Sequence, residues 1–279
     1  MNEKYEIRAD VLSAEDITGF IPTLKKHPGF LKRVMKFFAI DKVNWLHSRS
    51  CFKEGVEVPG GMLKDLDVKV DIENGKVLEN LPQGAFITVS NHPFGAIEGI
   101  MLTWLIGRYR PSFKVMVNMI LNKISGMRQY FIAVDALATD DPAKQAVSRR
   151  GIMECLRQLK DGEPLGFFPA GAVSKVNKHL RLEDREWQPS VIRIIQKAKV
   201  PVIPIFFQGH NSWWFNLLGM ISWKIRTLRL PAEVFNKEHK TMVVTVGNPV
   251  SVEEQAQHQG SIEEFGSWLK AQTYALRHD

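Results

Sequence analysis

The feature that most constrains the fold of this chain is the alternation of short apolar runs with stretches of helical spacing. Apolar runs occupy residues 85–90, 113–117, 130–134, 165–168, 202–207 and 242–246. Helical spacing of apolar residues fills most of the intervals, at residues 98–108, 142–160, 189–199 and 262–276. Buried strands that alternate with helices predict a largely parallel sheet covered by helices on both faces. We therefore expect an α/β fold with one central sheet of this kind.

The N-terminal segment, residues 1–60, reads differently from the main domain at residues 61–279. Residues 17–48 have helical spacing with Lys and Arg beside an apolar stripe, and the turn-rich run GVEVPGG follows at Gly55 to Gly61. Such a stripe is typical of a helix that lies in a lipid interface, and equally of a helix packed on the main domain. We expect a helical N-terminal segment and leave its contact with lipid open.

Length and composition place the chain among ordinary folded proteins. Of the 279 residues, 44 % are apolar and 24 % are charged, as in soluble domains. No apolar stretch approaches the roughly 18 residues of a membrane-spanning helix, and residues 1–10 contain no apolar run. We expect a cytoplasmic protein, or one bound peripherally at the inner face of the cell membrane.

The cysteines do not predict a metal site. Cys51 and Cys155 lie far apart in the chain and form no cluster of ligands. We expect two unpaired thiols in a reducing compartment and no bound metal.

The formal net charge of +7 favours an anionic partner, whether phospholipid, coenzyme A, an acidic carrier protein or nucleic acid. A nucleic-acid surface would need aromatic residues interleaved with the basic runs, and this sequence lacks that pattern, so we exclude nucleic acid as a partner. A basic surface that is merely solvated is the alternative for any single run.

The decapeptide SNHPFGAIEG, residues 90–99, follows one predicted strand and opens a helix. Sites in open parallel sheets gather at the carboxyl ends of strands. There Glu98 would reach back to hold one ring nitrogen of His92, and the other nitrogen would be free to accept a proton. Transfer of an acyl group from a thioester needs such a base. The alternative is a turn built by its Asn, Pro and Gly residues, with an incidental histidine.

Two further segments stand at predicted strands. The run GFFPAGAVSK, residues 166–175, ends one strand, and VPVIP, residues 200–204, opens another. The proline and glycine of the first run would bring backbone close to a ligand, and Ser174 and Lys175 would meet a polar or anionic group. Each run alone is more typical of a strand-to-loop turn or a core strand.

Together, in this order, the three segments resemble the phospholipid/glycerol acyltransferase superfamily. Asn91-His92 is similar to its first motif, Phe168-Pro169-Ala170-Gly171 with Ser174 to its third, and Val200 to Pro204 to its fourth. The similarity spans about residues 86–250. It is greatest to the bacterial hemolysin-like branch, which contains lyso-ornithine-lipid O-acyltransferases and which the runs FKVMVN and GHNS also resemble.

This resemblance implies an enzyme that transfers a fatty-acyl group from acyl-CoA or acyl carrier protein to the hydroxyl of a lysolipid. Those carriers would be co-substrates, with no bound cofactor. The resemblance assigns His92 the role of general base and Glu98 that of its orienting acid. The substrate-binding residues that it implies are Asn91, Pro93, Phe94, Gly95, Phe168, Pro169, Ala170, Gly171, Ser174 and Lys175.

Departures from the superfamily pattern bear on the acceptor. The acid is Glu98, one residue later than the usual Asp, and Ala170 replaces the acidic residue of the third motif. The second motif, near Tyr130 to Leu137, lacks the Arg that would bind a glycerol phosphate, and Asp135 stands there instead. These departures favour an aminolipid acceptor such as lyso-ornithine lipid over lysophosphatidate. They also leave open a catalytically inactive module of the same fold that binds lipid or protein.

Two sets of polar contacts are expected during the reaction. Backbone N–H groups at residues 93–96, or near Gly171, would stabilise the oxyanion. The phosphates of the acyl donor would meet basic side chains after the third motif, namely Lys175, Lys178 and Arg181.

Contact with the membrane surface is expected at an aromatic cluster formed by Trp213, Trp214 and Phe215. The stretch that continues from it to Trp223 is too short to cross a bilayer but suits the interface. Packing of these rings inside the protein, as core or as a lid over an acyl pocket, is the alternative.

Overall fold

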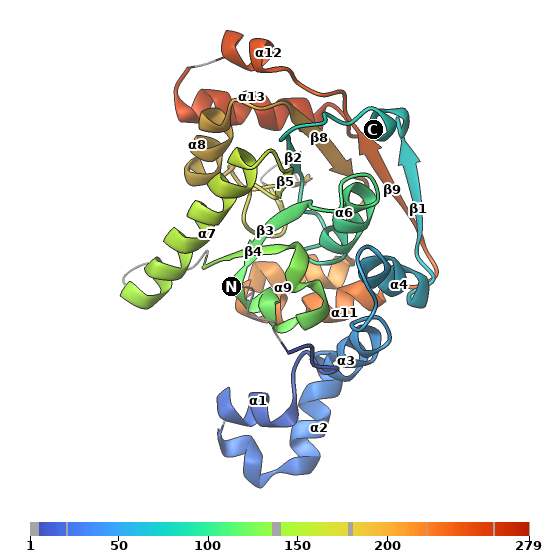
Figure 1. The fold of residues 1–279 in the computed structure, drawn as a ribbon. Coiled ribbons are helices and arrows are strands. Elements are labelled where there is room, and N and C mark those ends of the chain that lie inside the picture. Colours follow the sequence, from blue (N-terminus) through green and yellow to red (C-terminus); the bar gives the residue numbers. More distant parts are fainter. Residues whose placement is uncertain are drawn as a thin grey trace.

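A computed structural model describes residues 6–20, 22–135, 141–177, 181–221, 223–258 and 260–278. Its centre is a seven-stranded sheet in the order β1-β9-β8-β2-β5-β3-β4 (Figure 1). The strands are β1 (Lys69–Glu73), β2 (Ile87–Ser90), β3 (Lys114–Asn118), β4 (Phe131–Val134), β5 (Leu165–Phe167), β8 (Val202–Phe207) and β9 (Thr241–Val246). Neighbouring strands are parallel, except that β8 and β9 are antiparallel. The predicted α/β fold with a largely parallel sheet is confirmed.

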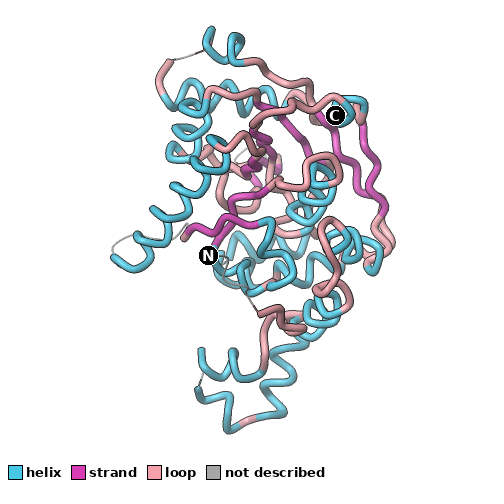
Figure 2. Tube along the Cα trace, viewed as in Figure 1, coloured by secondary structure: helices cyan, strands magenta, loops and turns pink. Residues whose placement is uncertain are grey.

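Helices cover both faces of this sheet (Figure 2). One core takes apolar side chains from α4 (Glu57–Asp65), α6 (Ile97–Gly107) and α11 (Leu230–Phe235). The core on the other face takes them from α7 (Pro142–Lys160), α8 (Pro189–Ala198) and α13 (Ile262–Tyr274). Because each face has its own core, the apolar runs of the sequence are buried on both sides.

Strand β8 illustrates why such a run forms a central strand. All of its residues are buried, as expected of a strand covered on both faces. Ile203, Ile205 and Phe207 join the core that contains α6, whereas Val202 joins the opposite core. This alternation follows from the two-residue period of a strand.

Smaller elements surround the sheet. They are α5 (Lys76–Glu79), η2 (Met119–Lys123), η3 (Ser125–Tyr130), β6 (Lys175–Val176), β7 (Leu182–Glu183), α9 (Trp213–Ile221), α10 (Trp223–Leu228) and α12 (Val252–Gln257). Strands β6 and β7 pair as a separate antiparallel hairpin, and α9 lies against β6. This hairpin and α9 therefore border the loop that follows β5.

The N-terminal segment is helical, as the periodicity predicts. It consists of α1 (Ala14–Phe20), η1 (Pro22–Lys26), α2 (Pro28–Phe37) and α3 (Ile40–Ser48). In Figure 1, α1 and α2 project away from the sheet, and they share a small cluster around Ile17 and Leu31. Helix α3 joins them to the main body, because Leu46 belongs to the core that contains α6.

The run from Gly55 to Gly61 does not separate residues 1–60 from the main domain. Helix α4 begins at Glu57, and its Pro59 lies in the first turn, where proline costs no backbone hydrogen bond. A boundary between residues 60 and 61 would cut this helix, which packs along α6. Helix α4 therefore belongs with the main domain.

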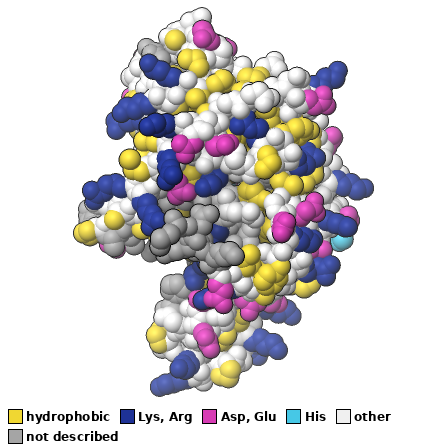
Figure 3. Space-filling view, viewed as in Figure 1, with side chains coloured by type: hydrophobic (Ala, Val, Ile, Leu, Met, Phe, Trp, Pro, Cys, Tyr) yellow, Lys and Arg dark blue, Asp and Glu magenta, His cyan; other side chains and the backbone are white. Residues whose placement is uncertain are grey.

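In the described part of the chain, no helix has both the length and the apolar character needed to cross a bilayer. Lys and Arg side chains are spread over the face seen in Figure 3, with acidic and apolar side chains between them. The positive net charge is therefore not collected into one patch on that face.

Candidate active site

The candidate site is built where three neighbouring parallel strands end. Strand β2 lies between β8 and β5, and both pairs are in parallel register. The loops that follow them begin at Asn91, Phe168 and Gln208. Segments more than 100 residues apart in the sequence thus meet at one edge of the sheet, as the topology of open α/β sheets predicts.

Asn91 extends the sheet by means of its side chain. Its Nδ2 donates to the carbonyl of Phe207 at 3.0 Å, and its Oδ1 accepts from the Phe207 N–H at 2.8 Å. The side chain is buried, and both of its polar groups are used in this way. Asn91 therefore holds the loop after β2 against β8, and its amide is not available to a substrate.

His92 and Glu98 are brought together by the turn that starts α6. Glu98 lies in the first turn of the helix with a fully buried side chain, and its Oε1 is 2.9 Å from Nδ1 of His92. The carboxylate also accepts backbone N–H groups from Phe94, Gly95 and Ala96 at 2.6–2.9 Å. A carboxylate is favoured at a helix N-terminus, where backbone N–H groups have no partner inside the helix.

The two groups shift each other's protonation. Burial lowers the pKa of His92, but the charge and contact of Glu98, with the charge of Asp184, outweigh it and raise the pKa above 6.5. Burial raises the pKa of Glu98, but His92 and the backbone N–H groups of the turn bring the pKa below its ordinary value. Glu98 thus remains a carboxylate that holds the imidazole through Nδ1.

The second ring nitrogen of His92 is left for chemistry. Among the described residues, no hydrogen bond to Nε2 is formed, and the side chain is 18 % exposed. The ring of Phe168 packs against the imidazole with centroids 4.6 Å apart. The imidazole is therefore held by a carboxylate on one side and an aromatic ring on a face, with Nε2 able to exchange a proton.

Asp184 is a site residue that sequence reasoning missed. Its Oδ1 accepts from the Ser174 hydroxyl at 2.6 Å and from the backbone N–H of His92 at 3.1 Å. Its Oδ2 accepts from the indole N–H of Trp187 at 3.3 Å. Burial raises the pKa of Asp184, although the Ser174 hydroxyl and the N–H and charge of His92 act against that rise.

This carboxylate ties the first and third motifs together. The Ser174 N–H also donates to the carbonyl of His92 at 2.8 Å, so the two loops are joined by both backbone and side chain. The contact with His92 could not be predicted from the sequence, because the two residues stand 92 positions apart. The only local signal for Asp184 is its partner Trp187, three positions later in the chain.

Most of the residues predicted to bind substrate are buried parts of this framework. Phe94, Ala170 and Ser174 are 3–4 % exposed, and Pro93 and Pro169 are also buried. The Ser174 hydroxyl is bonded to Asp184. These side chains shape the site from behind, whereas the neighbouring Lys175 is exposed.

Gly95 and Gly171 are required by backbone conformation. Both have positive φ, of 82° and 62°. A Cβ on Gly95 would lie 2.5 Å from Leu230 Cδ2, and a Cβ on Gly171 would overlap the amide of Gln188. These glycines let the two loops pack closely.

The backbone N–H groups at residues 93–96 do not form the predicted oxyanion site. Residue 93 is a proline, and the next three N–H groups donate to Glu98. The Gly171 N–H donates to the carbonyl of Phe168. The expectation is wrong for these groups, because the Glu98 carboxylate already accepts the N–H groups that the oxyanion would need.

Asp135 lies away from His92. It follows the edge strand β4, which is three strands from β2 in the sheet, about 14 Å at the usual strand spacing. Its backbone binds the Ser148 hydroxyl. Repulsion of an acceptor phosphate by Asp135 therefore loses its support, and residues 136 and 137 of that motif lie outside the described residues.

The aromatic cluster after β8 is divided between surface and core. Trp213 and Trp214 are 73 % and 72 % exposed, whereas Phe215 is 1 % exposed. Phe215 cannot touch a membrane from this position, so its assignment as a membrane contact is wrong. The helical period turns one face of α9 inward and the other to solvent. The side chain of Trp223 lies outside the described residues.

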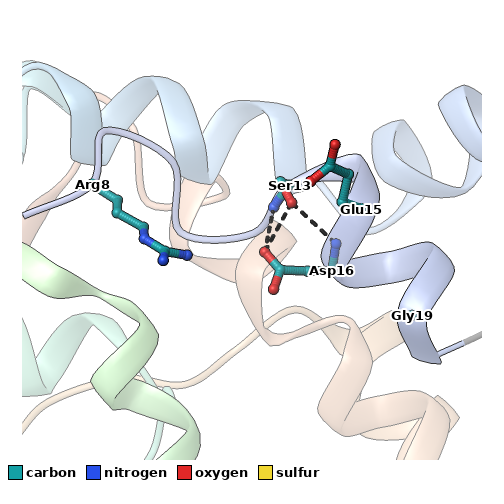
Figure 4. Close-up of a pocket in the computed structure, with 5 residues that line it drawn as sticks. All are labelled: Arg8, Ser13, Glu15, Asp16 and Gly19. Carbon is teal, nitrogen blue, oxygen red and sulfur yellow. Dashed lines mark hydrogen bonds between the residues drawn. The ribbon is translucent and has the colours of Figure 1, made fainter. Parts of the chain in front are cut away.

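Two depressions lie elsewhere on the surface. One of about 430 Å³ lies where α1 begins, beside the Ser13–Asp16 hydrogen bonds drawn in Figure 4, and is lined by Arg8, Ser13, Glu15, Asp16 and Gly19. It contains no predicted site residue. The other, of about 650 Å³, lies between the β6–β7 hairpin and α13 and is lined by Asn177, Arg181, Glu183, Tyr274 and Arg277. Lys178, which was expected to contact the donor phosphates together with Arg181, lies outside the described residues.

Known proteins resemble the chain over most of its length. A model of the acyltransferase family matches residues 14–279. A lyso-glycine lipid O-acyltransferase of Bacteroides thetaiotaomicron is 32 % identical over 218 residues, which cover 75 % of this chain and 76 % of that protein. One from Phocaeicola vulgatus is 28 % identical over 218 residues, covering 75 % and 74 %. The crystal structure of the Thermotoga maritima 1-acyl-sn-glycerophosphate (LPA) acyltransferase aligns with a TM-score of 0.47 and 16 % identity, over 88 % of this chain and 90 % of that one.

Proposed function

This chain belongs to the acyltransferase family, within the phospholipid/glycerol acyltransferase superfamily, and we propose that it transfers a fatty-acyl group from a thioester to the hydroxyl of a lysolipid. The family resemblance and the prediction of an acyltransferase are confirmed. The observation that carries the proposed chemistry is the 2.9 Å contact between His92 Nδ1 and the buried Glu98 carboxylate.

His92 is the general base of the proposed reaction. Its Nε2 takes the proton of the acceptor hydroxyl as that oxygen attacks the thioester carbonyl carbon. The C–S bond breaks as the tetrahedral intermediate collapses, and the departing thiolate takes the proton from the imidazolium. The products are the new ester and the free thiol of the carrier, and Glu98 stabilises the imidazolium between these steps.

The proposed acceptor is a lysolipid with an amino-acid head group. The two relatives are named as lyso-glycine lipid O-acyltransferases, which supports a glycine head group over the ornithine head group first favoured. The absence of an Arg from the second motif also disfavours a glycerol phosphate head group on the acceptor.

The proposed donor is an acyl thioester of coenzyme A or of acyl carrier protein. Basic side chains stand on and near the β6–β7 hairpin: Lys175 is exposed, and Arg181 lines the 650 Å³ depression together with Arg277. A phosphate-rich carrier is attracted to such a group of cations. This supports donor binding beside the hairpin that follows the third motif.

The proposed place of action is the inner surface of the cell membrane, with α9 in contact with lipid. The exposed face of α9 carries Trp213, Trp214, Met220 and Ile221, each at least 69 % exposed. Indole rings favour the membrane–water interface. An enzyme that acts on a lysolipid gains access to its acceptor there.

The test compares lipids of cells that express the wild type, His92→Ala or His239→Ala, followed by an acyl-transfer assay on the lysolipid that changes. Loss of a positioned base should lower the rate about 10²- to 10⁴-fold. His239 is a matched control, because its side chain is 78 % exposed and pairs with Asp67 at the surface. Equal product from His92→Ala and wild type would overturn the assignment and favour a lipid-binding module.

A further inference from the structure

Arg226 in α10 is a buried cation without a counter-ion. The residue is 5 % exposed. No carboxylate among the described residues forms an ion pair with it, and its Nε has no hydrogen-bond partner. Buried charges in proteins are ordinarily paired, because an unpaired one loses its hydration without compensation.

The contacts that Arg226 does make are weak. Its two terminal nitrogens donate to the carbonyls of Ser174 and Val173 at 3.4 and 3.5 Å, the long end of the range for hydrogen bonds. The guanidinium lies 5.5 Å from the Phe215 ring centroid. Burial, and then the charge of Arg185, lower the pKa of Arg226. The surroundings therefore disfavour the charge that this side chain carries.

Arg226 is placed beside the candidate site. Ser174, whose carbonyl it touches, donates its N–H to the carbonyl of His92. Val173, the other contact, packs where a side chain on Gly95 would be. The guanidinium thus contacts the segment that is hydrogen-bonded to His92, the proposed base.

Helix α9 packs closely on the aliphatic part of this side chain. A Cβ on Gly219 of α9 would lie 2.6 Å from Arg226 Cδ. The arginine therefore lies beneath the helix whose outer face carries Trp213 and Trp214.

We propose that Arg226 binds an anionic group of a substrate and that this group supplies the missing counter-charge. The inference rests on the proposed function. A guanidinium presents two parallel N–H groups that match a carboxylate or a phosphate. Two sources offer such a group: an amino-acid head group joined to lipid through its nitrogen keeps a free carboxylate, and the acyl donor carries phosphates.

The test measures KM with two matched pairs of substrates. The acceptor pair is a lysolipid with a free glycine carboxylate and its methyl ester. The donor pair is palmitoyl-CoA and the palmitoyl thioester of N-acetylcysteamine, which has no phosphate. The variants are Arg226→Met and Arg226→Lys, with Arg229→Gln as control, since Arg229 is partly exposed and binds the Phe37 carbonyl.

Loss of Arg226 should raise KM about 10- to 100-fold for the charged member of one pair and leave KM for its uncharged partner unchanged. An effect confined to the carboxylate supports the proposal with the acceptor as the source. An effect confined to coenzyme A supports it with the donor as the source. Unchanged KM ratios in both pairs would overturn the proposal, because Arg226 would then be structural.

A binding measurement separates this inference from the proposed function. The thermal midpoint is measured with N-palmitoylglycine, with its methyl ester and with coenzyme A. A stabilising shift that needs both the anion and Arg226 supports the proposal even if the wild type acylates no lysolipid. Arg226→Met should itself keep the midpoint or raise it, because it removes an unpaired buried charge. The proposal would be contradicted if Arg226→Met lowered the thermal midpoint and if the anionic ligands stabilised the wild type no more than the methyl ester does.

Discussion

His92 depends on Glu98 both for its orientation and for its charge. The carboxylate raises the pKa of His92 above 6.5 against the effect of burial. A general base must be neutral to accept a proton, so activity should rise with pH through a pKa above 6.5. The proposed reaction therefore slows as the pH falls below that value, because the imidazole becomes protonated.

Glu98→Gln should move this acid limb to lower pH. The substitution removes the negative charge that stabilises the imidazolium. Burial lowers the pKa of His92, and the charge of Glu98 then no longer opposes this effect. The plateau of kcat/KM should also fall by about 10²-fold or more, because the amide orients the ring less well. The measurement is kcat/KM against pH between 5 and 9, the span in which His titrates.

Asp67→Asn is the control for this experiment. Asp67 faces His239 at 3.0 Å, and both side chains are more than 60 % exposed. The Asp67→Asn substitution should leave both the acid limb and the plateau of the kcat/KM profile unchanged. An acid limb in Glu98→Gln that coincides with that of the wild type would show that the limb belongs to another group.

The turn between β2 and α6 is the element on which the site depends. It must reverse the chain within the six residues 91–96 and still direct three backbone N–H groups at one carboxylate. Gly95 permits this with φ of 82°, a conformation that costs other residues about 1–2 kcal/mol.

Gly95→Ala should lower the free energy of unfolding by about 1–3 kcal/mol and reduce kcat. The added methyl would meet Leu230 and Val173, so the turn must move and carry His92 with it. Urea unfolding and kcat on the same preparation measure the two effects.

Gly99→Ala is the matched substitution four residues along. Gly99 lies in α6, and no atom stands within 4 Å of the position of an added Cβ. Alanine should therefore stabilise the helix by up to about 1 kcal/mol. Equal stability of the two variants would mean that the turn tolerates a side chain at residue 95.

The molecule as a whole carries an apolar face beside its candidate site. Trp213 and Trp214 expose more than 70 % of their surface at the start of α9, and the loop after β8 joins this helix to the site. Exposed tryptophans next to other apolar side chains are typical of a surface that meets another phase or partner.

The double substitution of Trp213 and Trp214 by Ala should weaken binding to anionic lipid vesicles on the order of 10-fold or more, with little change in the thermal midpoint. Co-sedimentation with vesicles measures the binding. Phe215→Ala provides the contrast, because it removes a fully buried ring and should cost about 3–5 kcal/mol of stability. Vesicle binding that survives loss of both indoles would contradict contact through α9.

Local pattern was sufficient for the strands and for the position of His92. The apolar runs at β5 and β8 are strands because burial on both faces leaves no polar side to the pattern. The turn after β2 could also be predicted, because Asn, Pro and Gly favour a turn at the end of a strand. These properties depend on neighbours within a few residues.

Only the tertiary structure decided how the site is held and which side chains face inward. Asp184, Arg226 and the Asn91 amide act through partners that stand 52 to 116 positions away, and no spacing in the sequence signals such contacts. Whether Phe215 packs in the core or faces a membrane depends on how α9 is rotated about its axis. In the structure, its ring is buried near Arg226. The sequence by itself determined which runs are buried and where His92 stands, because those follow from hydrophobic period and from turn residues close in the chain. The tertiary structure decided the rest, because it alone brings distant polar groups into one low-dielectric space.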